Sequence, residues 1–381
     1  MRILLVGDYP RDPRLGSTKV LTKLHEEFRE LGHTCDLLLS DDIGAAPRQF
    51  HLHQAFGPVA AWRAVARACK ARGPYDVVDV ASAEGLWIAS LGRRSVGGAA
   101  VVSRSNGLEH LNYRRMLDDA AAGLAAKPWT RRWFHPAVRL SQVSAAARAA
   151  DRLLLPNDGD RAFALERKWK PAAEIDVVPH GVSARFLDSS PLPDAPRGGG
   201  ILFCGTWTPV KGVTYLAEAF SRLIRSGRTV NLTVLGGAVP EGEIRSAFPS
   251  DARPFLTVRD RVPEDEVMAS YRRHDVLAWP STYEGFGMVV VEAMSQRLPV
   301  VATPVGCAAS LVVPERTGLL VPARDPAALA AALDRLLADR TLAARCAETA
   351  FEQVRGMTWT RTAERTLDVY TKAIAASRPG R

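Results

Sequence analysis

Cysteine is scarce in this sequence, and the cysteines present form no pattern. The chain of 381 residues has an odd number of them, and none lies in a Cys-x-x-Cys pair. The five are Cys35, Cys69, Cys204, Cys307 and Cys346. This spacing argues against a disulfide framework or a zinc site, so we expect small buried apolar side chains. His51 and His53 lack a third ligand nearby, and no metal is expected.

Long apolar runs are also absent. The first one ends after five residues, at Asp8, and is too short for a secretory signal, while no other run is long enough to span a membrane. We therefore expect a cytoplasmic protein, either free or peripheral at the inner face of the membrane. The net charge of +9 favours anionic partners. No nucleic-acid module or aromatic platform is recognisable, so nucleic acid is not an expected partner.

One segment concentrates the positive charge. Residues Lys127–Arg139 read KPWTRRWFHPAVR, in which cations alternate with Trp129, Trp133 and Phe134. This composition suits an anionic membrane surface. The alternative is the start of an exposed helix whose aromatic side chains pack inward.

Short apolar runs bounded by glycine alternate with amphipathic helical segments along most of the chain, which predicts βα units and parallel sheets. Ser17 is the expected cap of the first helix, and Gly32 its end. The predicted strands are 2–6, 34–39, 76–80, 99–103, 152–155 and 175–178, then 201–204, 231–235, 255–258, 276–279, 300–302 and 319–321.

The domain organisation follows from one interruption of this pattern. Residues 189–200, SSPLPDAPRGGG, are rich in proline, serine and glycine and predict a linker. Before it lies a first Rossmann-like domain, 1–188, and after it a second, 201–356. In such doubly wound α/β domains, ligands bind beyond the carboxyl ends of the strands. The loops at those ends therefore hold the candidate site residues.

The stretch TYEGFGMVVVEAM, residues 282–294, follows one such strand and carries two glutamates. Glu284 lies in the turn, and Glu292 in a helix rich in valine that we expect to be buried nearly all round. A carboxylate in such a helix needs hydrogen-bond donors. These could come from a basic residue such as Arg297 or from the vicinal hydroxyls of a ribose. The Gly-Phe-Gly turn at the helix start favours a nucleotide, because free amides and the helix dipole bind anions.

A second loop, GTWTPVKG at residues 205–212, places Lys211 at the start of a helix. The lysine could neutralise a diphosphate, or it could be an ordinary surface lysine. The loop matches neither the Walker pattern nor GxGxxG. The first domain also lacks GxGxxG spacing, which disfavours a nicotinamide cofactor.

Residues 201–356 resemble the retaining glycosyltransferases of the GT-B fold, in the group called family 4 or group 1. The motifs that carry the resemblance are ILFCGTWTPVKGV, PSTYEGFGMVVVEAMSQRLPVVATPVG and TGLLVPARDPAALA, with seven residues between the two glutamates. It implies two Rossmann-like domains that face each other across a cleft, and a closing helix, 357–381, that returns to the first domain. It also implies no metal and no other cofactor, in agreement with the lack of a DxD-like cluster.

The resemblance implies roles for residues at the donor site. Glu284 and the amides of Gly285, Phe286 and Gly287 would meet the donor sugar and diphosphate. Glu292 would bind the ribose hydroxyls and Lys211 the diphosphate. Gly205 and Thr206 belong to the lysine loop, and Arg261 and Val262 would face the base. The implied catalytic residues are Glu284, Lys211 and Asn106.

Three positions depart from the family pattern. Thr206 stands where relatives have an arginine, and Ser310 where they often have a glutamate. Asn106 aligns best with the family's first-domain histidine, with Ser105 the neighbouring possibility and with Arg104 and His110 close enough to substitute.

The first domain would hold the acceptor. The expected contacts are Gly16, Ser17 and His110, with Asn106 and Glu84 as further candidates. Gly16 would permit a close approach of the acceptor, or could serve turn geometry alone.

The function implied is transfer of a sugar from a nucleotide diphosphate donor to an acceptor hydroxyl with retention, in glycan, polysaccharide or glycolipid assembly. Leaving-group stabilisation would be the main catalytic contribution, and Glu284 would position the sugar. The acceptor could be a glycan, a lipid-linked molecule or a small secondary metabolite. The alternative from another class is a nucleotide-sugar-binding protein without transferase activity, which the missing arginine at Thr206 favours.

Overall fold

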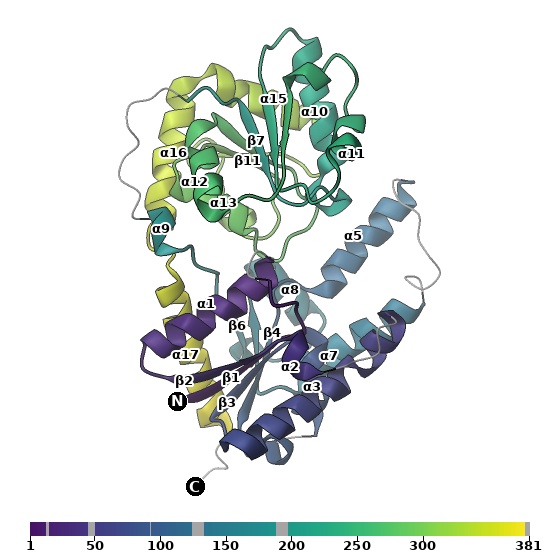
Figure 1. The fold of residues 1–381 in the computed structure, drawn as a ribbon, viewed down its shortest axis with the longest axis vertical. Coiled ribbons are helices and arrows are strands. Elements are labelled where there is room, and N and C mark those ends of the chain that lie inside the picture. Colours follow the sequence, from purple (N-terminus) through teal and green to yellow (C-terminus); the bar gives the residue numbers. More distant parts are fainter. Residues whose placement is uncertain (13–14, 45–49, 92, 124–132, 188–196, 378–381) are drawn as a thin grey trace. The chain divides into compact units, whose positions relative to one another are not determined.

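The computed structural model describes residues 1–12, 15–44, 50–91, 93–123, 133–187 and 197–377. The chain forms two compact units, and each contains one parallel sheet (Figure 1). The first unit comprises Met1–Gly181 and Trp359–Arg381, and the second Val182–Thr358. The first unit therefore ends before the predicted boundary at 188. Most of the predicted linker lies outside the described residues, and 197–200 belong to the second unit.

The first unit is built on a six-stranded sheet in the order β2-β1-β3-β4-β5-β6. Its strands are β1 (Arg2–Val6), β2 (Thr34–Leu38), β3 (Val77–Ala81), β4 (Ala100–Arg104), β5 (Arg152–Leu155) and β6 (Ile175–Val177). Strands β1, β3, β4 and β5 are almost wholly buried, as expected for a parallel sheet covered on both faces. The strand order reverses between β1 and β3, which makes that edge the topological switch point.

The longer helices of this unit are α1 (Gly16–Glu30), α3 (Phe50–Arg72), α5 (Glu109–Ala121), α7 (Ser141–Ala149), α8 (Asp158–Glu166) and α17 (Trp359–Ser377). The shorter ones are α2 (Ser40–Ile43), α4 (Gly85–Ser90), η1 (Ser82–Glu84), η2 (Arg93–Val96), η4 (Ala172–Glu174) and the π-helical η3 (His135–Leu140). The prediction that Ser17 caps α1 is wrong. Leu15 is the N-cap, and Ser17 already lies in the first turn.

A buried charged group attaches α17 to the sheet. Arg104 on β4 donates to Asp79 on β3, and both side chains are fully buried. Tyr370 on α17 donates its hydroxyl to the same carboxylate, and its ring packs 5.6 Å from Phe28 of α1. The carboxylate thus links the C-terminal helix to the centre of the first sheet.

The second unit has a six-stranded parallel sheet in the order β12-β11-β10-β7-β8-β9. Its strands are β7 (Ile201–Cys204), β8 (Leu232–Leu235), β9 (Leu256–Arg259), β10 (Val276–Trp279), β11 (Val300–Ala302) and β12 (Leu319–Leu320). Its helices are α9 (Ala184–Leu187), α10 (Val213–Arg225), α11 (Glu241–Ser246), α12 (Glu264–Arg273), α13 (Met288–Ser295), α14 (Ala308–Leu311), α15 (Pro326–Ala338) and α16 (Arg340–Val354), with η5 (Pro209–Lys211) and η6 (Arg253–Phe255). Here the switch point lies between β7 and β10.

Every predicted strand is present, with ends that differ by one residue at most. The valine-rich segment is helix α13, and it is buried from Val290 to Ser295 as predicted. Among the described residues, no helix is long and apolar enough to cross a membrane. In the same part of the chain, no group of three or more potential ligand side chains is placed to hold a metal ion.

Candidate functional site

In the second unit, the two loops chosen from the sequence meet at the switch point between β7 and β10. The Thr282 backbone amide donates to the Val210 carbonyl at 2.8 Å, and the Thr282 hydroxyl donates to the same oxygen at 3.1 Å. Gly212 lies in the left-handed region at φ +70°, and a Cβ there would stand 1.9 Å from the Pro280 carbonyl oxygen. Only glycine allows this approach, so the two loops form one fixed surface.

Lys211 and Glu284 form an ion pair on this surface. Ser281 also donates its hydroxyl to Glu284 at 2.9 Å. The lysine side chain is 27% exposed and the glutamate 11% exposed, so the pair is accessible from one side. An anion that approached Lys211 would compete with Glu284 for its charge. The structure therefore brings together two of the three predicted catalytic residues.

The turn before α13 is held by contacts that require glycine. Gly287 has φ +92°, and a Cβ on it would lie 2.6 Å from the Trp279 ring. The Cys307 amide donates to the Phe286 carbonyl at 2.6 Å, which fixes the turn from the loop after β11. Burial, followed by the charge of Glu284, raises the pKa of the Cys307 thiol. The predicted amides of 285–287 thus stand at the rigid N-terminal end of a helix, where an anion is favoured.

Glu292 is 8% exposed, and Tyr271 donates its hydroxyl to the carboxylate at 3.2 Å. Burial and the neighbouring Cys204 and Glu292 raise the pKa of Tyr271, which keeps the phenol protonated as a donor. The alternative of an ion pair with Arg297 is wrong. The Arg297 guanidinium binds Glu348 at 2.7 Å instead.

The remaining predicted donor residues occupy two neighbouring loops. Gly205 follows β7 with φ +139°, and Thr206 beside it is half-buried. Val262 packs against the core, and Arg261 is exposed in the loop after β9. Because β9 is at the edge of the sheet, with β8 between it and β7, this loop lies farther along the same end of the sheet.

The first unit has a polar cluster at its own switch point. Arg139, just before α7, donates to Glu84 at 2.7 Å and to Glu109 at 2.9 and 3.0 Å. Ser82 donates to Glu109 at 2.7 Å. Although burial acts in the opposite direction, Arg139 and Ser82 lower the pKa of Glu109. Arg139 therefore does not belong to a surface patch; it is an interior partner of two carboxylates. Residues 127–132 of the predicted basic segment lie outside the described residues.

Asn106 lies next to this cluster. Its amide oxygen and nitrogen are buried, and the amide interacts with the Tyr9 phenol. Burial, and then the charges of Glu84 and Glu109, raise the pKa of Tyr9. Tyr9 follows β1, Glu84 follows β3 and Asn106 follows β4, so side chains from three strand ends converge here. These groups can hydrogen-bond a hydroxylated ligand.

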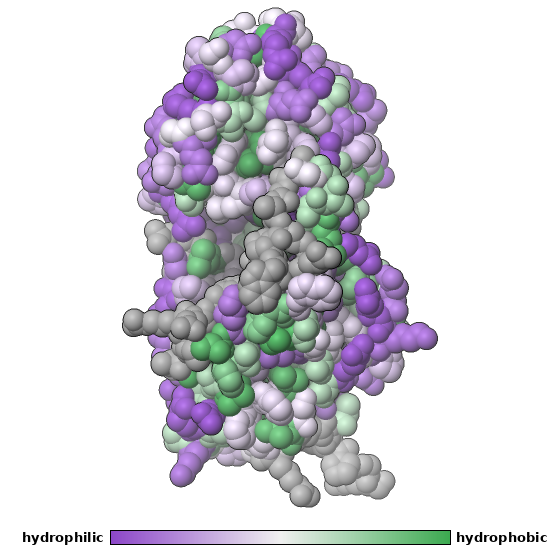
Figure 2. Space-filling view, turned by 90° about the vertical axis from the view of Figure 1, so that its right-hand side faces the viewer, coloured by the Kyte–Doolittle hydropathy of each residue, from purple (hydrophilic) through white to green (hydrophobic). Residues whose placement is uncertain are grey.

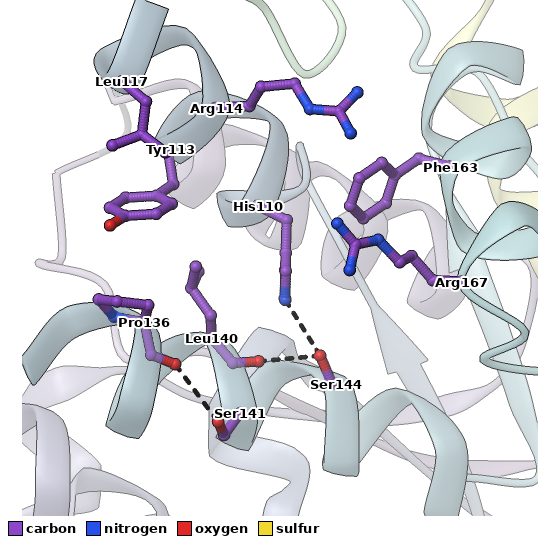
Figure 3. Close-up of a pocket in the computed structure, with 10 residues that line it drawn as sticks. All are labelled: His110, Tyr113, Arg114, Leu117, Pro136, Leu140, Ser141, Ser144, Phe163 and Arg167. Atoms are coloured by element: carbon purple, nitrogen blue, oxygen red, sulfur yellow. Dashed lines mark hydrogen bonds between the residues drawn. The ribbon is translucent and has the colours of Figure 1, made fainter. Parts of the chain in front are cut away.

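Three other predicted residues of the first unit are placed differently. Gly16 and Ser17 open helix α1, and a Cβ on Gly16 would touch nothing within 4 Å, so no steric need for glycine exists there. His110 lies in a separate pocket, where Nε2 is 3.0 Å from the Ser144 hydroxyl (Figure 3). Arg104, a suggested substitute for the family histidine, is committed to Asp79 in the core.

Sequence reasoning missed Tyr271, Ser281, Tyr9, Glu109 and Arg139. Ser281 and Tyr9 lie in loops at the carboxyl ends of strands next to the switch points, and Glu109 directly follows the loop after β4, so all three have a position that the sequence already marked. Tyr271 and Arg139 are on helices that approach from elsewhere, and no local pattern marks them.

Comparisons with known proteins agree with this geometry. Residues 198–339 match the family model described as Glycosyl transferases group 1. A D-inositol 3-phosphate glycosyltransferase of Kineococcus radiotolerans is 32% identical over 265 residues, which cover 63% of this chain and 61% of that protein. The chain thus matches about three fifths of the relative's length. The matched residues 198–339 include the sequence motifs that carry the resemblance to the group 1 glycosyltransferases.

Solved structures extend the comparison to the whole fold. Sucrose-phosphate synthase from Thermosynechococcus elongatus superposes with a TM-score of 0.80 at 22% identity, covering 98% of this chain and 99% of that one. Anabaena HepE, solved in complex with UDP and glucose, gives 0.69 at 15% identity, covering 98% and 100%. At these identities the likeness shows the fold alone. The fold is GT-B, and the predicted fold class is confirmed.

Proposed function

We propose that the protein is a retaining glycosyltransferase that moves a sugar from a nucleotide diphosphate donor to an acceptor hydroxyl. The observation that carries the proposal is the Lys211–Glu284 pair, which lies on fixed loops at the switch point of a group 1 glycosyltransferase domain. A structural neighbour supports a nucleotide sugar, since Anabaena HepE was solved in complex with UDP and glucose. The relative named D-inositol 3-phosphate glycosyltransferase supports transfer of a sugar to an acceptor that carries hydroxyl groups.

The donor would be held by three groups of this unit. Lys211 and the amides at the start of α13 would receive the diphosphate, because both offer positive charge to the same surface. Glu292 would accept hydrogen bonds from the ribose hydroxyls, with Tyr271 holding its carboxylate in place. Glu284 would position the sugar once its lysine turns to the phosphate.

In the reaction, the bond between the sugar and the diphosphate breaks while the acceptor oxygen arrives on the same face. The departing diphosphate gains charge, and Lys211 and the helix dipole stabilise that charge. A diphosphate oxygen can accept the acceptor's proton, so the chain itself supplies no nucleophile. We propose that no metal is needed. The cluster of Tyr9, Asn106 and Glu84 in the first unit would bind the acceptor.

A second candidate function is binding of a nucleotide sugar without transfer. Thr206 favours it, because a hydroxyl stands where the family has a diphosphate-binding arginine. A transferase for a small secondary metabolite differs only in the acceptor. In each case the donor site is the same, so the donor test comes first.

The test is thermal unfolding with UDP, GDP, ADP and CMP. A ligand at about 100 times its Kd adds about 2.7 kcal/mol of stability. One nucleotide should shift the wild type, and Glu292→Gln should lose most of the shift. Glu348→Gln, which removes an exposed carboxylate outside the site, is the matched control and should keep it.

Turnover then separates the two candidates. Incubation with the sugar forms of the selected nucleotide should release nucleoside diphosphate, measured by chromatography, and release should fall in Lys211→Gln. Binding without release from any sugar would establish the non-catalytic function. If no nucleotide shifts the wild type, the proposed donor site is wrong.

A further inference from the structure

The first unit has a pocket of about 340 Å³ between α5, the η3–α7 segment and α8, and the proposed function does not use it. Figure 3 shows that its walls differ in character. Arg114, Phe163 and Arg167 form one side, and Tyr113, Leu117 and Leu140 lie on the other. His110 stands between the two walls, in contact with Ser144 at the base.

The cationic wall brings together two arginines distant in sequence. The guanidinium carbons of Arg114 and Arg167 lie 5.7 and 5.3 Å from the centroid of the same Phe163 ring. The ring face attracts both, and this partly offsets their mutual repulsion. In the described part of the chain, neither guanidinium lies within ion-pair distance of a carboxylate. Two unneutralised cations at one ring are a strong attraction for an anion.

The lining of the pocket carries net positive charge. The residues that line it include no aspartate or glutamate in the described part of the chain. Burial lowers the pKa of His110 to about 4, although the charge of the neighbouring Glu109 acts in the opposite direction, so the ring is neutral at neutral pH and adds no third charge. The ring packs 4.9 Å from Trp169, which fixes its orientation.

The opposite wall is apolar and continues to an exposed apolar surface. Pro136 lines the pocket, and Trp133, one turn earlier, is 66% exposed. The start of α3 lies beside it, since the His51 ring is 5.0 Å from that of Phe134, and α3 exposes Leu52 and Phe56. Figure 2 also shows apolar side chains at several places on the surface of the first unit.

We propose that this pocket binds an amphiphile with a phosphate head. The phosphate would lie between Arg114 and Arg167, because planar guanidiniums match phosphate oxygens with paired hydrogen bonds. The apolar part would lie along Tyr113, Leu117 and Leu140 and leave the pocket toward Trp133. The residues that line this pocket belong to the first unit and include none of the proposed donor residues and none of Tyr9, Glu84 or Asn106. The proposal therefore does not depend on the proposed function.

The first arm of the test measures binding of octyl phosphate, below its micelle concentration, to the full chain by titration calorimetry. Arg114→Gln combined with Arg167→Gln should weaken binding by about tenfold or more. The matched control is Arg63→Gln with Lys70→Gln, which removes the same charge from exposed positions on α3. It should bind as the wild type does. Leu117→Gln should weaken octyl phosphate but leave the weaker binding of inorganic phosphate unchanged.

The second arm identifies the source of the phosphate. Vesicles of phosphatidylcholine with and without phosphatidylglycerol are mixed with the protein and separated by flotation. Recruitment by the anionic vesicles that is lost in the double variant assigns the pocket to a lipid in a bilayer. Octyl phosphate binding without recruitment assigns it to a soluble phosphate ester. Both outcomes support the phosphate site.

Two results would overturn the proposal. One is octyl phosphate binding that survives Arg114→Gln with Arg167→Gln. The other is an equal loss in the α3 control, which would mean non-specific attraction to net positive charge. Unfolding temperatures of all variants, compared with wild type, ensure that a loss of binding reflects the pocket, since these arginines are exposed and make no ion pair in the described structure.

Discussion

At the scale of single residues, Lys211 is the feature that most directly links structure to the proposed reaction. Its ion pair with Glu284 would have to open for the proposed diphosphate to bind, and the partial exposure of both groups would make this exchange inexpensive. The same exchange would leave Glu284 available to the sugar. In the proposed reaction, occupancy of the diphosphate site and orientation of the sugar would thereby be coupled through the Glu284 carboxylate.

Glu284→Gln tests this coupling. Glutamine keeps the shape and can still accept from Ser281, but it no longer neutralises Lys211. We expect nucleoside diphosphate to bind more tightly, by about 1 kcal/mol or about fivefold, while sugar transfer slows. Lys211→Gln should instead weaken binding by about 2 kcal/mol, or about 30-fold. Titration calorimetry measures both. Weaker binding by Glu284→Gln would show that the carboxylate does not compete for the lysine.

Two glycines give a matched comparison of backbone needs. Gly212→Ala should destabilise the second unit by about 1–3 kcal/mol, because the position has positive φ and its Cβ would overlap the Pro280 carbonyl. Gly16→Ala should be neutral or stabilise by up to about 1 kcal/mol. Urea unfolding measures both. If Gly16→Ala also raises the acceptor KM, then Gly16 serves close approach of a ligand; an unchanged KM assigns it to turn geometry.

Residue identities were predictable where a local pattern marks them. Glu284 and Lys211 follow strand ends within glycine-bounded loops, and their selection needed no structure. Their pairing was not predicted, because 73 positions separate them in the chain. Arg139 was assigned to a basic surface because its neighbours in the sequence are basic and aromatic. The carboxylates that bind it come from two other elements. Partners that converge from distant segments leave no trace in a local window.

At the scale of elements, the strands were predictable because buried parallel strands are short continuous apolar runs. Helix α13 was predictable from strand order, which left no place for another strand. The start of α1 was misplaced because a serine normally caps a helix, while here Leu15 occupies that position without a side-chain cap. The Leu15 amide donates to the Asp12 carbonyl, so a backbone hydrogen bond holds the residue that precedes the helix.

Helix α17 should depend on one hydroxyl. Tyr370→Phe removes a donor from the buried Asp79 carboxylate, which then relies on Arg104 alone. We expect a loss of about 2 kcal/mol, since this hydrogen bond goes to a charged group. Tyr113→Phe on the half-buried face of α5 is the control and should change stability by less than about 0.5 kcal/mol. Urea unfolding followed by tryptophan fluorescence measures both, and equal losses would contradict the assigned role.

His180, which contacts helix α17, should make the stability of the first unit depend on pH. Its ring stacks on Trp359 of α17, and burial, followed by the charge of Arg104, lowers its pKa to about 3. An unfolded histidine titrates near pH 6.5. Between these values the unfolded state binds a proton that the folded state does not, so stability falls as pH falls.

His180→Gln should reduce this slope. The comparison is the free energy of unfolding in urea between about pH 7 and pH 4, where His110 contributes in the same direction in both proteins. The difference between wild type and variant therefore isolates His180. Parallel curves for the two proteins would show that His180 does not control the acid sensitivity.

At the scale of the whole molecule, composition and alternation of elements predicted two Rossmann-like domains. The sequence placed the first division at a segment rich in proline and glycine, because flexible composition is its main signal for a boundary. The compact units divide instead at Gly181, before that segment, since the residues from Val182 onward already contact the second sheet and its helices. Boundaries set by packing are not visible in local composition.

The two units should respond separately to ligand and mutation. Multidomain proteins commonly unfold in more than one transition, and differential scanning calorimetry resolves them. The nucleoside diphosphate selected in the thermal screen should raise the transition temperature of the second unit only. At about 100 times its Kd, it should add about 2.7 kcal/mol to the free energy of unfolding of that unit. Tyr370→Phe should lower only the other transition. The variant with ligand should show both shifts together, because the two groups lie in different cores. A ligand shift that follows the transition lowered by Tyr370→Phe would place the nucleotide in the first unit and refute the assignment of donor binding to Lys211, Glu284 and Glu292.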